Sequence, residues 1–294
     1  MSDVKISTAD IQKLREMTGA GMMDCKKALT EAGGDAEKAI EILRQKGLKK
    51  SAEKQSRVAK EGIVLAEVNA DQTSGVMVEL NCETDFVAKN TDFVKFAEDV
   101  LAEIKSTKPK SVEALTESPA SYDSGKKVGE TVMEMTAKIG EKIAIRRFAN
   151  VETKSGVIAQ YIHPGNKLGV LVELKVDGYA KEMQSDAHAL AHDIAMQAAA
   201  MNPMCIRRDQ IPAEAIEKEK AILIEQGKQE GKPEKVLENI VKGRLEKYYQ
   251  EVCLEEQVFV KDGSKTIKDR LADLTKKLGK PVQIQSFERF RLGE

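Results

Sequence analysis

The residues best placed to do chemistry in this chain are an acid and an aromatic that stand side by side after an apolar run. Thr84, Asp85, Phe86 and Val87, here called the TDFV segment, follow the apolar residues 75–82. A phenylalanine in such a turn is available to anchor a partner, and a carboxylate beside it can fix or cap the turn. The alternatives are a core position for Phe86 and a pure capping role for Asp85. The segment favours binding over bond making.

The chain contains none of the familiar sequence motifs of nucleotide-binding loops and hydrolase active sites. The sequence contains no GxxxxGKS/T loop, no GxGxxG after a strand, no HExxH and no GxSxG. The four cysteines are isolated, without the CxxC spacing of a zinc module or a disulfide framework: Cys25, Cys82, Cys205 and Cys253. Reduced thiols fit this pattern best. We therefore expect no enzyme activity, no cofactor and no metal site.

The chain has only three histidines. His188 and His192 are four positions apart in an Ala-rich stretch typical of a helix, so they can share one face. No cysteine or carboxylate pattern completes a metal site, and the better interpretation is helix-surface or core-edge positions, with metal binding as the alternative. His163 precedes Pro164 at a predicted hairpin turn. We expect His163 to be exposed and to be a weaker candidate for a partner contact.

Charge and hydropathy limit the partners. Of 294 residues, 47 are Lys or Arg and 48 are Asp or Glu, which gives a net charge of −1. This balance provides no long-range attraction to nucleic acid or to an anionic membrane. No apolar run approaches membrane-spanning length, and the first residues have no apolar or Arg-rich leader. We expect a cytoplasmic, unexported chain without stable nucleic-acid or membrane binding.

Two short helices are expected at the start. The first, capped by Ser7 or Thr8, ends at residues 18–21, and its apolar face is Ile11, Leu14 and Met17. The second begins with Met22 and Met23 side by side. Neighbours on a helix are about 100° apart, so both cannot point into a small core. We expect one to be exposed, and the pair either fills a loose core or contacts a partner.

A third helix and a charged linker follow. Asp35 caps the helix, whose apolar stripe ends at Gly47. The resulting three-helix bundle has about 45 residues, a size that is marginal on its own. Residues 48–57 carry charge without an apolar period, which predicts a solvated linker, either helical or not. Its surroundings contain the basic residues that favour a nucleic-acid role: Lys49, Lys50, Lys54, Arg57 and Lys60.

The middle of the chain is duplicated. Each copy has two apolar runs whose glycines are 13 residues apart: Gly62 and Gly75 in the first copy, Gly156 and Gly169 in the second. Each copy predicts a β-hairpin followed by a helix, the first turning at Gly75 and the second at residues 164–166. Two related α+β subdomains are the expected result.

The duplication provides a comparison for the TDFV segment. Its positions align with residues 178–181 of the second copy, Gly-Tyr-Ala-Lys, where the acid–aromatic pair is missing. A requirement of the hairpin-to-helix turn would be expected in both copies. The difference favours a functional over a structural reason for Asp85 and Phe86.

The last third of the chain predicts a helical arm and a mixed tail. Residues 212–226 and 233–250 are charged and heptad-like, and the Gly-containing loop between them predicts an antiparallel hairpin of helices. A strand at 258–260, a helix at 267–278 and an extended segment at 282–290 follow. The tail could pack on the body or on a partner.

Two segments of the chain closely resemble bacterial translation elongation factor Ts, the guanine-nucleotide exchange factor of elongation factor Tu. One is residues 14–29, LREMTGAGMMDCKKAL, and the other is residues 79–89, with the TDFV segment intact. Their order and separation make the resemblance specific. It extends over essentially the whole chain, because the helical start, the duplicated core and the arm match that family's plan.

The resemblance implies an α+β fold in four parts. Residues 1–54 would be a three-helix domain similar to ubiquitin-associated domains, with its linker. Residues 55–140 would be one core subdomain, and 141–205 with 250–294 the other. Residues 206–249 would be a protruding antiparallel helical arm. The arm serves self-association in some members, which implies a possible homodimer or a 2:2 complex with elongation factor Tu.

The function implied by the resemblance is nucleotide exchange during translation elongation. The chain would bind elongation factor Tu·GDP, displace Mg²⁺ through Thr84, Asp85, Phe86 and Val87, and promote GDP release. The residues matching the N-terminal docking positions are Arg15, Met22 and Met23, with His163 as a weaker contact on the core. The alternative is an RNA- or ribosome-binding adaptor without exchange activity, against which the near-zero net charge speaks.

Overall fold

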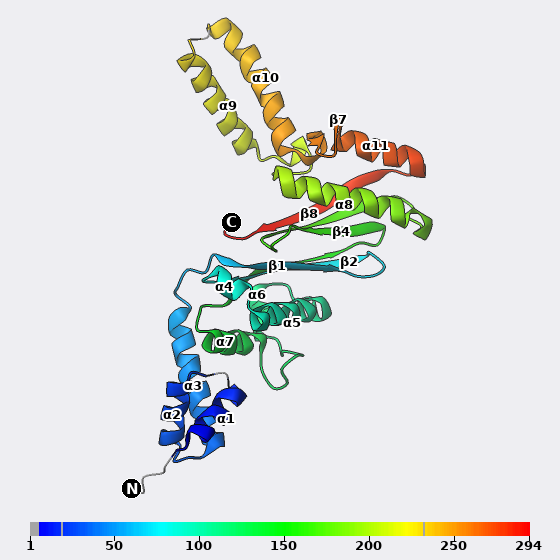
Figure 1. Ribbon diagram of the computed structural model, residues 1–294. Helices are drawn as coiled ribbons and strands as arrows, with labels where there is room; N and C mark the ends of the chain where they lie inside the picture. The colour runs from blue at the N-terminus through cyan, green and yellow to red at the C-terminus, as the bar shows by residue number, and fades with distance from the viewer. Residues whose placement is uncertain (1–5, 19, 232) are drawn as a thin grey trace. The chain divides into compact units, whose positions relative to one another are not determined.

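The computed structural model describes residues 6–18, 20–231 and 233–294, and it confirms a mixed α+β fold (Figure 1). Residues 1–5, 19 and 232 lie outside the described residues. They include parts of the predicted chain start, the first helix break and the arm loop, respectively. Internal contacts divide the chain into two units. The first comprises the residues up to Leu65, Val78–Phe148 and Leu292–Glu294, and the second Ala66–Met77 and Ala149–Arg291. The four domain ranges expected from the sequence stay a prediction.

The first unit begins with the three predicted helices: α1 (Thr8–Thr18), α2 (Met22–Glu31) and α3 (Ala36–Lys54). Ser7 and Asp10 exchange hydrogen bonds at the start of α1. The Asp35 carboxylate accepts from two backbone N–H groups of α3, as predicted. The shared core is small and built from Ile11, Leu14, Cys25, Ala28, Leu29 and Ala39.

Two predictions for this bundle are wrong. Met17 does not join the apolar face, since its side chain is 59% exposed. The linker is helical, one of the two alternatives, so α3 runs through Gly47 to Lys54; but the linker is not solvated throughout, because Ser51 is fully buried. The reason is packing on α7 (Val128–Ile139). A Cβ at Gly47 would lie 3.1 Å from that of Ala137, and the Ser51 hydroxyl donates to the Met133 carbonyl.

Each copy of the repeat forms a hairpin followed by a helix. In the first copy these are β1 (Glu61–Val68), β2 (Ser74–Cys82), the short helix α4 (Asp85–Ala88) and α5 (Thr91–Thr107). In the second they are β4 (Gly156–Ile162), β5 (Leu168–Val176), a 3-10 turn η1 (Lys181–Met183) and α8 (Gln184–Met201). The sequence duplication therefore corresponds to a duplicated order of elements.

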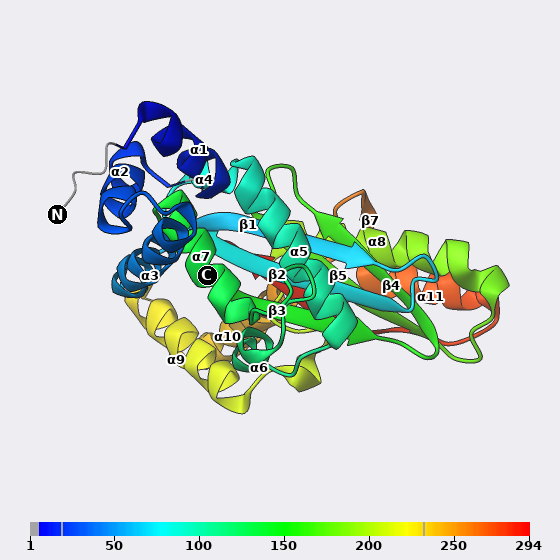
Figure 2. The same ribbon diagram turned by 90° about the horizontal axis from the view of Figure 1, so that it is seen from below.

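Each hairpin belongs to its own three-stranded sheet. The orders are β1-β2-β3, with β3 spanning Ala144–Glu152, and β4-β5-β8, with β8 spanning Val282–Arg291. Helices α5 and α7 lie on one face of the first sheet (Figures 1 and 2), and α6 (Val112–Glu117) precedes α7. The apolar residues of α8 form one core cluster with those of β4, β5 and β8. The extended tail thus packs on the body, antiparallel to β5.

The turn of the first hairpin differs from the prediction. Gly75 lies inside β2 and is buried, and the chain reverses over 69–73 instead. The Asn69 side chain accepts from the N–H groups of Thr73 and Ser74 and so satisfies the turn. Glycine is needed at 75 for space, because a Cβ there would lie 2.9 Å from the Ile158 side chain. The second hairpin turns at 164–166, as predicted, with positive φ at Gly165 and Asn166.

Gly62 and Gly156 perform the same task in the two copies. Their φ angles are +146° and +151°, in the region open to glycine. A Cβ at Gly62 would lie 2.1 Å from the carbonyl oxygen of Leu80, and one at Gly156 would lie 2.0 Å from that of Leu174. Both glycines therefore allow the first strand of the hairpin to approach the second where the strand begins.

The arm is confirmed as two helices, α9 (Ala213–Gln229) and α10 (Glu234–Val252), drawn yellow to orange in Figure 1. Their inner faces meet through Leu223, Val241 and Leu245, with Ile216, Tyr248 and Tyr249 around them. The 3-10 turns η2 (Arg208–Gln210) and η3 (Leu254–Glu256) flank the arm. The strands β6 (Val258–Phe259) and β7 (Asp262–Thr266) and helix α11 (Ile267–Leu278) complete the tail.

None of the helices in the described ranges is both long enough and apolar enough to cross a membrane.

We expect Gly62→Ala and Gly156→Ala each to lower the free energy of unfolding by about 2 kcal/mol or more, because the new Cβ meets a backbone oxygen that cannot move aside cheaply. Urea unfolding followed by circular dichroism measures this. Gly243→Ala in α10 is the matched control. Nothing lies within 4 Å of its Cβ position, so it should be neutral or stabilising. Equal stability of all three variants would contradict the shared role of the two strand glycines.

Candidate functional site

The TDFV segment forms the start of a one-turn helix. Thr84 has an extended backbone, and its hydroxyl accepts from the Val87 N–H at 3.4 Å, which makes Thr84 the N-cap of α4. Asp85 is the first helical residue and not the cap, contrary to the capping alternative. Its carboxylate forms an ion pair with Lys89 at 2.9 Å, one turn on. The Asp85 carboxylate also lies in the first turn of the helix, where the positive end of the helix dipole stabilises its negative charge.

Phe86 is the most exposed large apolar side chain among the described residues, at 82% of its surface. A core position beneath the following helix is therefore excluded. That role belongs to the buried Phe93 and Phe96 of α5. Val87 is half-buried and Ala88 is buried, so the segment is fixed on one side and open on the other.

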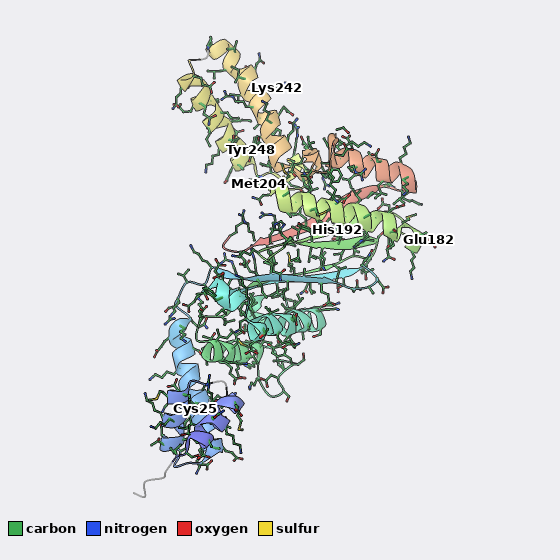
Figure 3. The ribbon with its side chains drawn as sticks, in the orientation of Figure 1. Cys25, Glu182, His192, Met204, Lys242 and Tyr248 are labelled. Carbon is green, nitrogen blue, oxygen red and sulfur yellow. The ribbon has the colours of Figure 1, made fainter. Side chains whose placement is uncertain are left out.

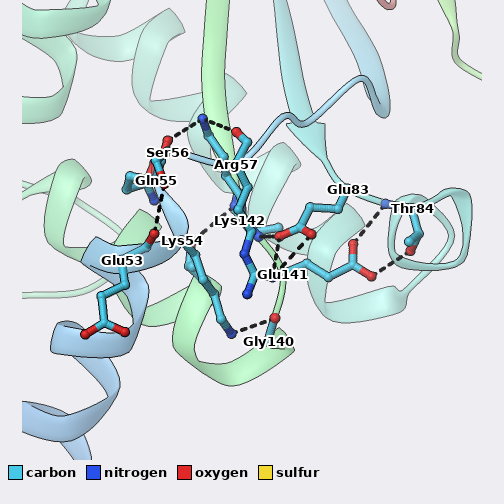
Figure 4. Close-up of polar contacts among 12 residues, drawn as sticks. Glu53, Lys54, Gln55, Ser56, Arg57, Glu83, Thr84, Gly140, Glu141 and Lys142 are labelled. Carbon is cyan, nitrogen blue, oxygen red and sulfur yellow. Dashed lines mark hydrogen bonds and ion pairs between the residues drawn. The ribbon is translucent and has the colours of Figure 1, made fainter.

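A reciprocal set of hydrogen bonds holds the segment in place (Figure 4). The carboxylate of Glu141 accepts from the backbone N–H of Thr84 at 2.9 Å and from its hydroxyl at 2.7 Å. In the opposite direction, Glu83 accepts from the backbone N–H of Lys142 at 2.7 Å. We call Glu83, Thr84, Glu141 and Lys142 the Glu83–Glu141 network. The 83–84 loop and the 141–142 loop are thus hydrogen-bonded to each other in both directions.

The network extends to the end of α3. The Lys142 ammonium donates to the carbonyls of Gln55 and Arg57 at 2.6 and 2.9 Å. The Arg57 guanidinium in turn donates to Glu83 at 3.3 Å. The Lys142 N–H, together with the nearby Arg57, holds the pKa of the Glu83 carboxyl below its ordinary value. Glu83 is therefore ionised at neutral pH and available as an acceptor.

Cys82 supports the same turn from inside. Its thiol is buried and donates to the carbonyl of Thr84 at 3.1 Å. Burial raises the pKa of Cys82 to about 12, and the charge of Glu141 acts in the same direction. The thiol is therefore protonated and structural.

Arg15, Met22 and Met23 lie on the surface of the N-terminal bundle. Arg15 is on α1, and the two methionines open α2, where both are more than half exposed, not one as expected. The exposed Met17 adds a third thioether to this surface. Flexible thioethers of this kind suit a contact with a partner. The sequence missed Met17 because its spacing fits the apolar face of α1.

His163 is exposed at the second hairpin turn, as predicted, and belongs to the second unit. Its Nδ1 lies 3.0 Å from the Tyr161 hydroxyl. Tyr161 also meets the ring of His192, which stacks on His188. Figure 3 shows His192 on α8. Burial lowers the pKa of His188, and the adjacent His192 adds to this. Tyr161 thus meets His163 and His192, and His188 reaches this group only through His192. Helix spacing predicted the shared face of His188 and His192, but not their approach to Tyr161 and His163.

No group of three or more metal-ligating side chains occurs within the described ranges. The basic residues of the linker are partly engaged in the structure. Lys54 donates to the Gly140 carbonyl at 2.6 Å, and Arg57 pairs with Glu83. These two are therefore less available to a nucleic acid than the sequence suggested.

Sequence reasoning missed Glu141, Lys142 and Arg57 as neighbours of the TDFV segment. Glu141 lies 57 positions from Thr84, and a Gly-Glu-Lys triplet after a helix looks like an ordinary helix end. No local pattern could have connected the two loops. They meet because β2 and β3 belong to one sheet.

A family model and several named proteins that resemble this chain all point to the same family. A family model described as "Elongation factor TS" matches residues 83–294. A protein named elongation factor Ts from Clostridium kluyveri is 46% identical over 289 residues, covering 98% of this chain and 93% of the relative. Its namesake from Prosthecochloris aestuarii is 46% identical over 290 residues, covering 98% and 99%. That from Chlorobium phaeobacteroides is 44% identical over 291 residues, with the same coverage.

We expect Glu141→Gln to loosen the start of α4, because an amide replaces the charged acceptor of both Thr84 hydrogen bonds. Hydrogen exchange at the Thr84 amide should accelerate by about tenfold, which corresponds to one charge-assisted hydrogen bond. Glu53→Gln, the same change on an exposed carboxylate of α3, is the control and should leave that amide unaffected. Unchanged protection of Thr84 in Glu141→Gln would show that the network does not hold the segment.

Proposed function

The chain belongs to the elongation factor Ts family, and we propose that it is the guanine-nucleotide exchange factor of elongation factor Tu. It binds elongation factor Tu·GDP, displaces Mg²⁺ and promotes GDP release during translation elongation. It makes and breaks no covalent bond in doing so. Family membership supports the reaction, and the exposed Phe86 on a firmly held turn supports the site.

The single observation that carries the site is the combination of exposure and fixation in the TDFV segment. An aromatic ring left in water loses the free energy that its burial would provide, about 2 kcal/mol or more for a whole side chain. Phe86 is held in that position by a capped turn whose cap is itself bound by Glu141. A fixed aromatic pays little ordering entropy when it enters a pocket of the partner.

The thermodynamics of exchange define what the segment has to do. A factor that binds the empty GTPase more tightly than the loaded one must weaken the nucleotide by the same factor, because coupling between two ligands is reciprocal. Contacts that are equally strong with the empty and with the nucleotide-loaded GTPase do not change the affinity for the nucleotide. Phe86 and Asp85 therefore act through contacts that elongation factor Tu offers only when its Mg²⁺ site is opened.

Each residue of the segment has a role in this proposal. Phe86 is an apolar wedge between helices beside the Mg²⁺ and phosphate site of the partner. Asp85 competes electrostatically near the ligands of the metal, while Thr84 and Val87 keep the turn in shape. Loss of Mg²⁺ leaves the phosphates with less countercharge, so the nucleotide leaves faster.

Docking is assigned to surfaces outside the segment. Arg15, Met22 and Met23 bind the GTPase domain, and His163 makes a weaker contact from the core. Met17, on α1 of the same bundle, is also exposed. A homodimer through the arm, or a 2:2 complex, is compatible with this arrangement. An RNA-binding adaptor is less well supported, since Lys54 and Arg57 have protein partners.

Phe86→Ala should abolish most of the acceleration of GDP release, by about 30-fold or more if Phe86 is an interface hot spot. Stopped-flow release of labelled GDP from elongation factor Tu measures this at saturating factor. Val258→Ala, which shortens a side chain that is 54% exposed in the second unit, is the control and should retain full activity. A wild-type chain that fails to accelerate release would refute the function, and an active Phe86→Ala would refute the wedge.

Arg15→Ala and Met22→Ala should affect docking and not the wedge. We expect the half-saturating concentration of the factor to rise about tenfold for each, while the maximal release rate changes little. The same stopped-flow titration, extended to high concentrations, separates the two quantities. A lowered maximal rate with unchanged half-saturation would place these residues in the exchange step instead.

A further inference from the structure

Two of the four cysteines meet at the base of the arm. The Sγ atoms of Cys205 and Cys253 are 3.7 Å apart, although the residues are 48 positions apart in the chain. Cys205 follows α8, and Cys253 ends α10. Met204 and Tyr248, labelled in Figure 3, mark this region. The other two cysteines, Cys25 and Cys82, lie in the first unit.

The backbone around the pair has the geometry that a disulfide needs. Cys205 and Cys253 form a parallel β-bridge. The Leu254 N–H donates to the Cys205 carbonyl at 2.9 Å, and the Cys205 N–H donates to the Val252 carbonyl at 3.2 Å. Neighbouring strands place paired Cα atoms about 4.8 Å apart, within the range of about 4.4–6.8 Å found in disulfides. The two sulfurs can therefore bond without a rearrangement of the chain.

The surroundings decide which oxidant can reach the pair. Cys253 is fully buried, and Cys205 keeps 8% of its surface exposed. Apolar and aromatic side chains cover both, among them Ile211, Tyr248 and Tyr249. Burial raises the pKa of Cys253 to about 12 and also raises that of Cys205. The thiols are therefore slow to react, and a small oxidant has the advantage over a bulky one.

We propose that Cys205 and Cys253 are an oxidative modification site, at which a peroxide converts the two thiols into a reversible disulfide that locks the base of the arm. The cross-link would join the two ends of the segment that contains α9 and α10. It involves no residue of the TDFV segment, so it is independent of the proposed exchange function. Its success or failure leaves that function untouched.

The reaction balances with hydrogen peroxide as the oxidant. The thiolate of Cys205, the more accessible sulfur, attacks one peroxide oxygen, the O–O bond breaks, and the departing hydroxide takes up a proton to become water. The product is a sulfenic acid on Cys205. The Cys253 thiolate then attacks this sulfur, the S–O bond breaks, and the departing hydroxide takes up the proton that the thiol released, which gives a second water. Two thiols and one peroxide give one disulfide and two waters, and a small dithiol reverses the change.

The disulfide would stabilise this part of the molecule mainly by restricting the unfolded chain. The loop that it closes contains the whole arm, and long loops lose the most conformational entropy when they are closed. The arm base is already held together by the β-bridge, so little native strain opposes the bond. Oxidation is therefore expected to protect the arm base from opening.

The test uses the full reduced chain treated with hydrogen peroxide and then alkylated under denaturing conditions. We expect peptide mass spectrometry to find the Cys205 and Cys253 peptides joined, two hydrogens lighter, with Cys25 and Cys82 alkylated. The thermal midpoint should rise by about 5 °C and return to its starting value after dithiothreitol. Formation should accelerate with rising pH as the thiolate fraction increases.

Variants give the matched comparison. Cys253→Ser should abolish the cross-link and the reversible rise in thermal midpoint, whereas Cys25→Ser should retain both. The wild-type mass analysis decides the proposal even if a serine variant fails to fold. Separate alkylation of Cys205 and Cys253 after exposure to peroxide, or over-oxidation of Cys205 to a sulfinic acid without a cross-link, would overturn it.

Discussion

The hydrogen bonds between the 83–84 and 141–142 loops are the constraint on which the exposed site depends. Helix α4 has only four residues, too few for its own backbone hydrogen bonds to make it stable. Its N-cap, Thr84, is bound by Glu141, and the preceding Glu83 is bound by Lys142. Because the turn is held from outside, Phe86 can remain in water without collapsing onto the core.

The same constraint connects the segment with the N-terminal helices. Lys142 reaches the carbonyls that follow α3, and Ser51 and Lys54 of α3 bind α7 and the residue after it. Helix α3 is thus part of the core's first unit as well as of the bundle. The two surfaces to which we assign docking and wedging are therefore carried by one connected set of elements.

The duplication separates what the fold requires from what it permits. Gly62 and Gly156 show that both copies need the same close approach of two strands. After the hairpins the copies diverge. Tyr179, which aligns with Asp85, packs against the core cluster of the second copy, whereas Phe86, which aligns with Ala180, is exposed. Both copies form the same hairpin and helix, so the hairpin itself does not require an exposed aromatic at Phe86.

Much of the fold followed from the sequence, because caps, apolar periods and repeated glycines act over a few residues. Asp35, the two hairpins, the paired arm helices and the candidate TDFV segment all depend on such local patterns. Gly47, Gly75 and Met17 were misjudged because a glycine looks like a break and a methionine like a core residue until their neighbours are known. Tertiary structure alone brought Glu141 to Thr84 and Cys205 to Cys253, since only a folded sheet and a closed arm place residues dozens of positions apart within hydrogen-bonding or bonding distance.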